Sequence, residues 1–543
     1  MRSIRYYFLI IFISFVPFVG IFLNADLPHT HDGLVHLPRI GAYFKALGDL
    51  QIPVRWAGDL NYGYGMPIFN FMYHVPYLIS SFLVFIGFGL VSAFKITLVF
   101  SFLLSGIFMF GFSLSFFKDL KKAFLATLFY QFFPFRLVEI LVRGSFGEVY
   151  AYAFFPLVLW GLTLTFKKPS YINILITSLG TAFLIISHNA LSLVFFMISM
   201  LFVLFFAGKL KNCVFGFVSL FIGLLLASFY WMPAIFEHKY TYGDLFMKNL
   251  YLLYFPPIQN FFIPNLFYDT KLQNQGIPVQ FGLFHTLILI GAIFVFFKKN
   301  ISKIDKKIIS FSIFIFVVSF FIMLPISKFV WERLSLLRQF QFPWRLLAVS
   351  GFVMSFISVS IFYFSFFKKN IVYFLLLFLT IISTAYYWHP VLGWDKIDES
   401  YYWSYPLTST GFGETDLIWS KGAADEYPAH RVDLIDGKGE IGKISKKSNL
   451  LTFPVSAKTP IKVVAHIQYF PGWRAYVDGR SVPIQFQYAI YRGEIVFQIP
   501  KGQHDIRLSF GESKLRFIAD SLTIMTVISL IIIGIFRRSL RLK

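Results

Sequence analysis

The sequence predicts an α-helical polytopic membrane protein with about twelve membrane-spanning helices, an extracytoplasmic β-sandwich near the C-terminus and a final membrane helix. Composition is the first observation, because 57% of the 543 residues are hydrophobic and only 14% are charged. Soluble proteins carry roughly 25% charged residues, so a soluble enzyme is excluded. The same hydrophobicity excludes an intrinsically disordered chain. The other two observations are a series of long apolar stretches and a polar, strand-rich segment after residue 387.

The apolar stretches are long enough to cross a bilayer, which takes about 17–25 residues. They lie at residues 7–23, 93–117, 122–141, 149–166, 171–187, 189–206, 212–230, 280–297, 308–324, 345–366, 371–387 and 517–536. The first stretch follows Arg2 and Arg5, and no small-x-small cleavage site precedes Asp26. We therefore interpret it as an uncleaved anchor and not as a signal peptide. A further apolar run at 76–91 is ambiguous.

Clusters of lysine and arginine predict the orientation in the cell membrane, because these residues accumulate in cytoplasmic loops. If the stretches above cross the membrane and residues 76–91 do not, all clusters and both termini lie on the cytoplasmic side. We therefore assign 76–91 to an interfacial or re-entrant helix of the first outer loop. Orientation then largely explains the net charge of +22, and no nucleic-acid partner is expected. The clusters are Arg2/Arg5, Lys118/Lys121/Lys122, Lys167/Lys168, Lys209/Lys211, Lys298/Lys299/Lys303/Lys306/Lys307, Lys368/Lys369 and Arg537/Arg538/Arg541/Lys543.

This topology divides the chain into three parts. Residues 1–387 form a transmembrane domain with large outer loops at 24–92 and 231–279, residues 388–516 form an extracytoplasmic domain, and residues 517–543 form the final helix with a basic cytoplasmic tail. The sequence contains no GxxxxGK(S/T) or GxGxxG phosphate loop, which argues against an ATP-driven pump. Its single cysteine excludes an intrachain disulfide and a cysteine-based zinc site.

Short strands at regular spacing predict a β-sandwich within residues 388–516. The expected strands are 449–453, 461–469, 473–477, 480–486, 494–499 and 505–510, and Asp478-Gly479 predicts a hairpin turn. No catalytic constellation is visible there, and we interpret His466 and His504 as surface or packing residues. The domain is therefore expected to be accessory.

Polar residues crowd the first outer loop just after the first membrane helix. Residues 26–39 contain two acids, three histidines and one arginine. If 32–47 is helical, Asp32, His36 and Arg39 share one face. A carboxylate there could act as a general base or bind a metal, and the arginine could hold a phosphate. The alternative is that Asp32 only caps the helix. A zinc site of His29, His31 and His36 matches no strong signature.

Further charged residues lie at outer ends of membrane helices, where charges are by default functional hypotheses. Arg143 and Glu148 flank one short outer loop, and either serve a site or simply form an ion pair with each other. His188 falls in a tight outer turn, where a cap or turn role is the alternative. Arg345 either snorkels to the interface or binds the phosphate of a lipid ligand.

Several motifs together carry a family resemblance that covers nearly the whole chain. They are HDGLVHLPRI at 31–40, YGYGMP at 62–67, RGSFGE at 143–148, His188-Asn189, QFPWR at 341–345, DEYP at 425–428, PGWRAYVDG at 471–479 and KGQH at 501–504. The layout resembles GT-C glycosyltransferases. It is more similar still to bacterial membrane proteins labelled "6-pyruvoyl-tetrahydropterin synthase-related domain" and to YfhO-like proteins. The pterin label implies no pterin chemistry here.

The resemblance implies a GT-C-like enzyme of the cell envelope that moves a sugar from a polyprenyl-phosphate donor to a glycan or protein acceptor. Asp32 would be the catalytic base, and Glu148 would orient the acceptor or help hold a cation. Arg39, Arg143 or Arg345 would neutralise the leaving phosphate.

The remaining expected substrate-binding residues are Asp26, His31, His36 and His188. GT-C enzymes often carry paired acids in the first loop, whereas Gly33 follows Asp32 here, so a divalent cation is left open and no metal ligand is assigned. The alternatives are a transporter or flippase of lipid-linked sugars and an inactive GT-C-like structural protein.

Overall fold

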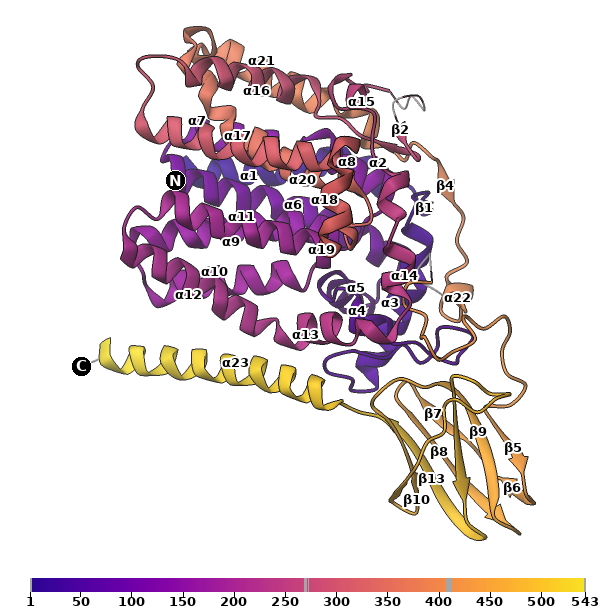
Figure 1. Ribbon diagram of the computed structural model, residues 1–543. Coiled ribbons are helices and arrows are strands. Elements are labelled where there is room, and N and C mark those ends of the chain that lie inside the picture. The colour runs from indigo at the N-terminus through magenta and orange to yellow at the C-terminus, as the bar shows by residue number, and fades with distance from the viewer. Residues whose placement is uncertain (1, 268–270, 272, 407–412, 542–543) are drawn as a thin grey trace.

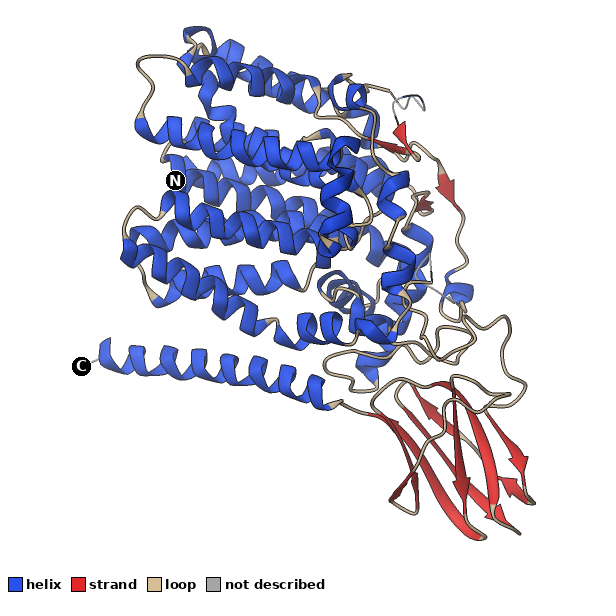
Figure 2. Ribbon diagram, in the orientation of Figure 1, coloured by secondary structure: helices blue, strands red, loops and turns tan. Residues whose placement is uncertain are grey.

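The computed structural model describes residues 2–267, 271, 273–406 and 413–541. Figure 1 shows a layer of roughly parallel long helices with a β-domain at one end, at the lower right of the view. Figure 2 shows that nearly all strands belong to this β-domain. The helices of the first half are α1 (Arg2–Phe15), α2 (Val19–Leu23), α3 (Gly33–Gly48), α4 (Ile68–Phe71), α5 (Val75–Phe85), α6 (Leu90–Phe117), α7 (Leu120–Gln131), α8 (Pro134–Val138), α9 (Glu148–Lys167), α10 (Tyr171–Ile185), α11 (Asn189–Phe206), α12 (Leu210–Leu226) and α13 (Ser228–Phe236).

The second half continues with short helices of the large outer loop, further apolar helices and a long terminal helix. They are α14 (Gly243–Met247), α15 (Ile258–Phe262), α16 (Leu283–Phe296), α17 (Lys303–Met323), α18 (Lys328–Arg333), α19 (Ser335–Arg338), α20 (Leu347–Ile357), α21 (Asn370–Ile382), α22 (Glu399–Tyr402) and α23 (Lys514–Arg541).

The described residues contain seven helices that are long and apolar enough to cross a membrane, or up to nine if each bent pair counts as one span. One bent pair joins Leu120–Gln131 to Pro134–Arg143 at 47°, and the other joins Leu210–Leu226 to Ser228–Phe236 at 71°. The remaining predicted stretches, near 171–187, 280–297 and 371–387, form apolar helices of 10–17 residues. Each of the twelve stretches is thus largely helical, but length alone supports fewer than twelve crossings.

The ambiguous run at 76–91 forms α5, which has only 11 residues. At 1.5 Å per residue it spans roughly 16 Å, about half of the bilayer's hydrocarbon core. It packs against α3 and α6. In Figure 1 it is seen nearly end-on while the long helices run across the view. Its length and direction favour the non-crossing assignment.

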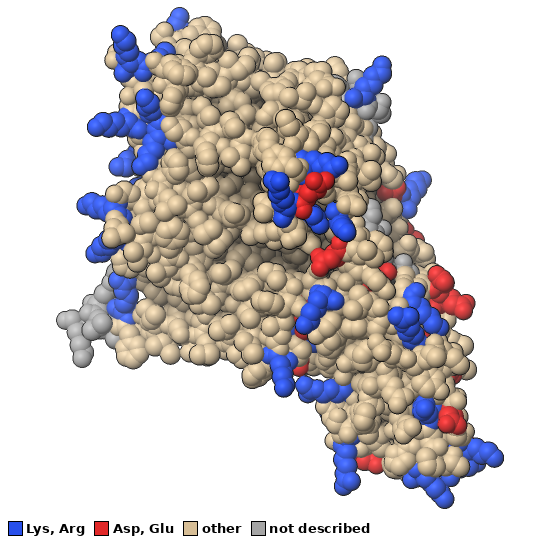
Figure 3. Space-filling view, viewed as in Figure 1, with Lys and Arg blue, Asp and Glu red and all other residues tan. Residues whose placement is uncertain are grey.

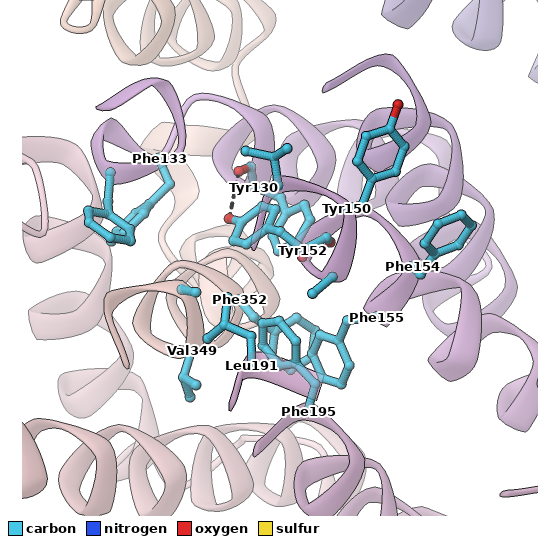
Figure 4. Close-up of a cluster of buried hydrophobic side chains, with 14 of the residues drawn as sticks. Tyr130, Phe133, Tyr150, Tyr152, Phe154, Phe155, Leu191, Phe195, Val349 and Phe352 are labelled. Carbon is cyan, nitrogen blue, oxygen red and sulfur yellow. Dashed lines mark hydrogen bonds between the residues drawn. The ribbon is translucent and has the colours of Figure 1, made fainter. Parts of the chain in front are cut away.

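Aromatic side chains fill the centre of the helical part. Phe155 stacks on Phe195 with ring centroids 4.2 Å apart, and Phe352 meets Phe155 edge-to-face at 4.7 Å. Tyr130 and Tyr152 stack at 4.1 Å, and each hydroxyl donates to the other residue's carbonyl. Figure 4 shows these rings together. Each buried hydroxyl is thereby satisfied, as a water-free interior requires.

Basic residues gather at one end of the helical layer, opposite the β-domain. Figure 3 shows lysines and arginines along the left edge, where the short loops between the helices lie. These loops include 118–122, 167–168, 209–211, 298–307 and 368–369, the positions of the predicted cytoplasmic clusters. The N-terminal end of α1 and the C-terminal end of α23 lie at the same end. The clusters therefore share one end of the helical part, as the predicted topology requires, and the side of the membrane on which this end lies stays a prediction.

Two antiparallel sheets form the β-sandwich. One has the order β11-β10-β13-β8-β6, with β7 also paired to β8, and the other has the order β12-β9-β5. Side chains alternate between buried and accessible along β10, and the buried set forms a separate core with Phe453, Val463 and Phe497. The strands are β5 (Val432–Asp436), β6 (Gly439–Ile441), β7 (Ser445–Lys447), β8 (Leu450–Ala457), β9 (Ile461–Gln468), β10 (Trp473–Val477), β11 (Arg480–Val482), β12 (Glu494–Ile499) and β13 (Gly502–Phe510).

All six predicted strands are present, although β11 ends at Val482 and not at 486. Val477 pairs with Arg480 across Asp478-Gly479, which confirms the predicted two-residue hairpin. Strands β5, β6 and β7 were not predicted, because they are short or largely exposed. The strands of the sandwich begin only at Val432, so the first part of the predicted 388–516 domain has another role.

Residues 388–406 run along the outer end of the helical part. Strand β4 (Trp394–Asp395) pairs with β1 (Leu27–Pro28) of the first outer loop. The Glu399 carboxylate accepts hydrogen bonds from the first two backbone N–H groups of α6, at 2.8 and 2.9 Å. A carboxylate at a helix N-terminus is favourable because it meets unpaired N–H groups. This segment therefore covers the helix ends and links them to the sandwich.

Candidate functional site

The backbone of the first outer loop holds Asp32 against the turn that follows α8. The His31 N–H donates to Val142 O at 3.1 Å, and the Asp32 N–H donates to Arg143 O at 2.8 Å. Asp32 directly precedes α3, yet its side chain makes no capping hydrogen bond. The capping alternative for Asp32 is therefore not what the structure shows. Its side chain is 41% exposed, which leaves the carboxylate accessible at the protein surface.

The turn after α8 brings Arg143 close to Asp32. Residues Glu139–Arg143 form a short π-helix, a wide turn that is frequent at functional sites. Gly144 ends it with a φ of +68°, which favours glycine. A Cβ atom at Gly144 would also lie 2.3 Å from Thr30 Oγ1. Both reasons explain why glycine stands where the two outer loops meet.

Arg143 is surrounded by three carboxylates. Its Nη1 lies 2.9 Å from both oxygens of Glu139 and 2.8 Å from Glu148 Oε1. Its Nη2 lies 3.7 Å from Asp32 Oδ2. The guanidinium also stacks over the ring of Trp344, 4.9 Å from the centroid. From the sequence, Arg143 and Glu148 either serve a site or simply form an ion pair with each other. The structure shows this ion pair, and Asp32 and Glu139 lie beside the same guanidinium.

Glu148 connects this cluster to the loop before α20. Its Oε1 accepts from Arg345 Nε at 2.9 Å, and its side chain is only 3% exposed. Arg345 also donates from Nη1 to Phe340 O at 2.7 Å and to Gln341 Oε1 at 2.8 Å. Arg345 is therefore bound inside the protein, which contradicts the interpretation that it snorkels to the interface.

His188 stands beside Glu148 as a neutral residue. Its Nδ1 accepts from the Leu191 N–H at 3.2 Å, and its Nε2 lies 3.8 Å from Glu148 Oε1. Burial outweighs the Glu148 charge and lowers the pKa of His188 to about 3. The capping role expected for a histidine in this turn is therefore present, together with proximity to the site.

Arg39 and His36 lie deeper in α3 than Asp32. His36 Nδ1 is 2.9 Å from Tyr77 Oη, and burial together with the charges of Arg39 and Arg143 lowers the pKa of His36. Arg39 is only 3% exposed, and its Nε and Nη2 atoms have no hydrogen-bond partner among the described residues. The exposed carboxylate of Asp32 thus differs in environment from the two side chains predicted to share its face.

The structure does not bring Asp26 into this cluster. Its N–H bonds to Asn24 Oδ1, and no ion pair within the described residues joins it to the other site residues. The ring of His31 points toward Gly276 of the second large loop. Burial lowers the pKa of His31.

Two members of the cluster were missed in the sequence. Glu139 lies inside the apolar stretch 122–141, where a carboxylate is itself a functional signal. Gln341 belonged to a quoted motif but was given no role. Among the described residues, no group of three or more His, Cys, Asp or Glu side chains could hold a metal ion.

The family motifs converge at two places. HDGLVHLPRI, RGSFGE, His188-Asn189 and QFPWR meet at the cluster above. YGYGMP, DEYP and PGWRAYVDG meet where the sandwich contacts the first outer loop, because Tyr62 packs on Tyr427 and Trp473 lines one pocket with Tyr64. There Arg431 Nη1 donates to Gly63 O at 2.7 Å, and the Gln468 N–H donates to Tyr64 O at 2.8 Å. The second convergence fixes the sandwich to the first outer loop. KGQH lies apart from both places, at the start of β13.

Comparison with known proteins agrees with these motifs. A family model described as "6-pyruvoyl-tetrahydropterin synthase related domain; membrane protein" matches residues 69–382, more than half of the chain. The chain belongs to this family of membrane proteins. It is also 24% identical over 244 residues to an uncharacterized protein of Lactococcus lactis subsp. cremoris (strain MG1363). This match covers 43% of the chain and only 40% of the relative's length.

Proposed function

We propose that the protein is a GT-C-like membrane glycosyltransferase. It would move a sugar from a polyprenyl-phosphate donor to a glycan or protein acceptor on the extracytoplasmic face. The observation that carries the proposal is the accessible carboxylate of Asp32, 3.7 Å from an arginine that buried acids hold in place. A base that the acceptor can reach, next to fixed positive charge, suits transfer from a phosphate leaving group.

The proposed reaction inverts the configuration at the anomeric carbon of the sugar. Asp32 takes the proton from the acceptor nucleophile, whose electron pair forms the new bond to the anomeric carbon. The bond from that carbon to the phosphate oxygen breaks, and its electron pair leaves with the polyprenyl phosphate. The proton remains on Asp32 until solvent removes it, which its 41% exposure permits.

Arg39 is the arginine best suited to the donor phosphate. Arg143 and Arg345 already bind carboxylates at 2.8–2.9 Å, whereas no ion pair within the described residues includes Arg39. The N–H groups of two of its nitrogens are buried and unsatisfied, so an anion that reached them would gain charge-assisted hydrogen bonds. In this proposal Arg143 and Arg345 supply positive potential, and Glu148 positions both without touching the acceptor.

The lipid-linked donor would approach from the bilayer. Figure 3 shows a hollow in this face of the helical part, beside α18 and α19. Apolar side chains on these short helices are exposed, among them Phe329 at 48% and Leu336 at 56%. In this proposal the basic loops at the opposite end are cytoplasmic, and the site lies on the extracytoplasmic side.

The test is a mass analysis of surface glycans and glycoproteins in a deletion strain, with and without the gene restored. The proposal expects one sugar to be lost from an envelope glycan or protein, and to return with the wild-type gene. Accumulation of an unchanged lipid-linked sugar on the cytoplasmic side only would instead indicate a flippase.

A further inference from the structure

A buried arginine below the candidate site has no ionic partner in the described structure. Arg136 of α8 is 1% exposed, and its Nη2 donates to Ser101 Oγ at 3.2 Å. Its Nε and Nη1 are buried without a hydrogen-bond partner among the described residues. The guanidinium lies over Tyr152, 4.8 Å from the ring centroid. This cation–π contact is favourable, but it leaves the N–H groups of two nitrogens unsatisfied.

A small cavity of about 10 Å³, close to the minimum that one water molecule needs, brings Arg136 together with two acids of the candidate site. Its lining consists of Phe135, Arg136, Glu139, Glu148, Tyr152, Leu191 and Ala348. Figure 4 shows Tyr152 and Leu191 in the packed region on its border. Glu148 Oε2 is also buried without a partner among the described residues. Unsatisfied donors and an unsatisfied acceptor therefore line one small space, the setting in which ordered water is found.

Charge balance gives the second argument. The ion pairs join three carboxylates, those of Asp32, Glu139 and Glu148, to the two guanidiniums of Arg143 and Arg345. This network carries a formal excess of one negative charge. Asp32 is partly exposed and solvent offsets its charge, whereas Glu139 and Glu148 are buried, and buried carboxylates are costly unless positive charge lies near.

Arg136 is placed to supply that opposite charge. It precedes Glu139 by three residues, and Glu139 precedes Arg143 by four, so the three side chains lie on one side of a helical turn. In the structure both Glu139 oxygens are turned to Arg143, which leaves space between Glu139 and Arg136.

We propose that Arg136 is a positioning residue of the candidate site, acting through ordered water in this cavity. The water accepts from Nε and Nη1 of Arg136 and donates to Glu139 and Glu148. The positive charge of Arg136 then favours the ionised form of Glu139, so that Arg143 remains fixed beside Asp32. The inference goes beyond the proposed function, because it concerns the ion network and holds for any reaction at Asp32.

A double-mutant cycle on the full-length protein in lipid nanodiscs tests the coupling. The variants are Arg136→Met, Glu139→Gln and the double substitution, and the measurement is the unfolding temperature. Arg136→Met is expected to lower it, and the loss should shrink to less than half in the Glu139→Gln background. Equal losses in both backgrounds would mean that Arg136 only packs, and would overturn the proposal. Glu332→Gln on α18 serves as the control background, in which the loss should remain full.

Arg136→Lys keeps the test decisive if Arg136→Met does not fold. It retains the charge, so it should recover most of the unfolding temperature in the wild-type background. In the Glu139→Gln background, the unfolding temperature of Arg136→Lys should exceed that of Arg136→Met by no more than half as much. If Arg136→Met cannot be purified, Arg136→Gln takes its place in this comparison. A density map that resolves water should show a peak within hydrogen-bond distance of Arg136 Nε or Nη1. A dry cavity, or an acyl chain in it, would contradict the proposal.

Discussion

Nη1 of Arg143 lies 2.8 Å from Oε1 of Glu148, and the same oxygen accepts from Nε of Arg345 at 2.9 Å. A single carboxylate oxygen thus joins an arginine of the turn after α8 to an arginine that precedes α20, 202 residues later. The geometry of the candidate site depends on this shared contact, because Arg143 in turn stands beside Asp32.

Glu148→Gln should destabilise the protein strongly. The substitution leaves two buried guanidiniums without this carboxylate, and breaking a buried ion pair typically costs about 3–5 kcal/mol. Thermal unfolding in detergent measures the effect. Glu332→Gln is the matched control, because Glu332 pairs with Lys328 at 3.7 Å on the exposed surface of α18. That change should cost less than about 1 kcal/mol. Similar losses of stability in the two variants would show that the buried ion pair stabilises the protein no more than the exposed one.

Arg39→Gln should weaken binding of the donor lipid. A hydrogen bond to a charged group contributes about 1.5–3 kcal/mol, which corresponds to roughly 10–150-fold in affinity. Titration of a fluorescent polyprenyl phosphate into the nanodisc-embedded protein measures the dissociation constant. Arg480→Gln on the exposed strand β11 of the sandwich is the control and should change it little. If Arg39→Gln bound the lipid as tightly as the wild type, the phosphate would have to be assigned elsewhere.

Reporter fusions test the orientation. A fusion after residue 120 should report a cytoplasmic position, and a fusion after residue 450 an external one, because the basic loops gather at the end opposite the sandwich. An external signal at 120 or a cytoplasmic signal at 450 would mean that α5 crosses the membrane or that the protein is inverted.

His466 should make the stability of the sandwich depend on pH. Its Nε2 lies 2.9 Å from Asp433 Oδ2 and its Nδ1 lies 2.5 Å from Glu494 Oε2. Burial lowers its pKa, but the hydrogen bonds to these two carboxylates outweigh burial and raise the pKa above the usual value. A raised folded-state pKa gives stability that is fully present below about pH 6.5 and is lost as pH rises through the folded value.

The measurement is the unfolding temperature of the full chain from pH 6 upward. It should fall with rising pH, and His466→Gln should be less stable at the acidic end and show a weaker decline. The groups around His466 include Tyr64, His430, Arg431 and Tyr491, and all are retained in the variant. A decline of the same size in His466→Gln would assign the pH dependence to another group.

Hydropathy and strand periodicity were sufficient to predict where most elements lie. They could not give helix lengths, because an apolar run continues through bends such as the 47° break between α7 and α8. The strands β6 and β7 escaped prediction because most of their residues are partly or fully exposed, so they lack apolar alternation. Such segments become strands because a neighbouring strand pairs with them, and the sequence does not show which strand that is.

The candidate site was predictable as a set of charged residues at outer helix ends, but its pairing was not. Arg143 contacts Glu139 and Glu148 as well as Asp32, and the choice depends on how α3, α8 and α9 pack. Arg136 and Glu139 were overlooked inside an apolar stretch. His466 looked isolated because Asp433 and Glu494 belong to neighbouring strands.

The central claim is that Asp32 is the base of a glycosyl transfer, and Asp32→Asn tests it most directly. The amide keeps the size of the side chain but removes its basicity, and loss of a general base typically costs about 10²–10⁴ in rate. The assay follows sugar transfer from the donor and acceptor identified in the deletion strain, with the protein reconstituted in liposomes. Asp26→Asn is the paired control, because Asp26 lies outside the cluster, and it should stay near the wild-type rate. Asp32→Asn should lose at least a hundredfold in rate while it still binds the donor lipid. Transfer by Asp32→Asn at a near wild-type rate would contradict the central claim.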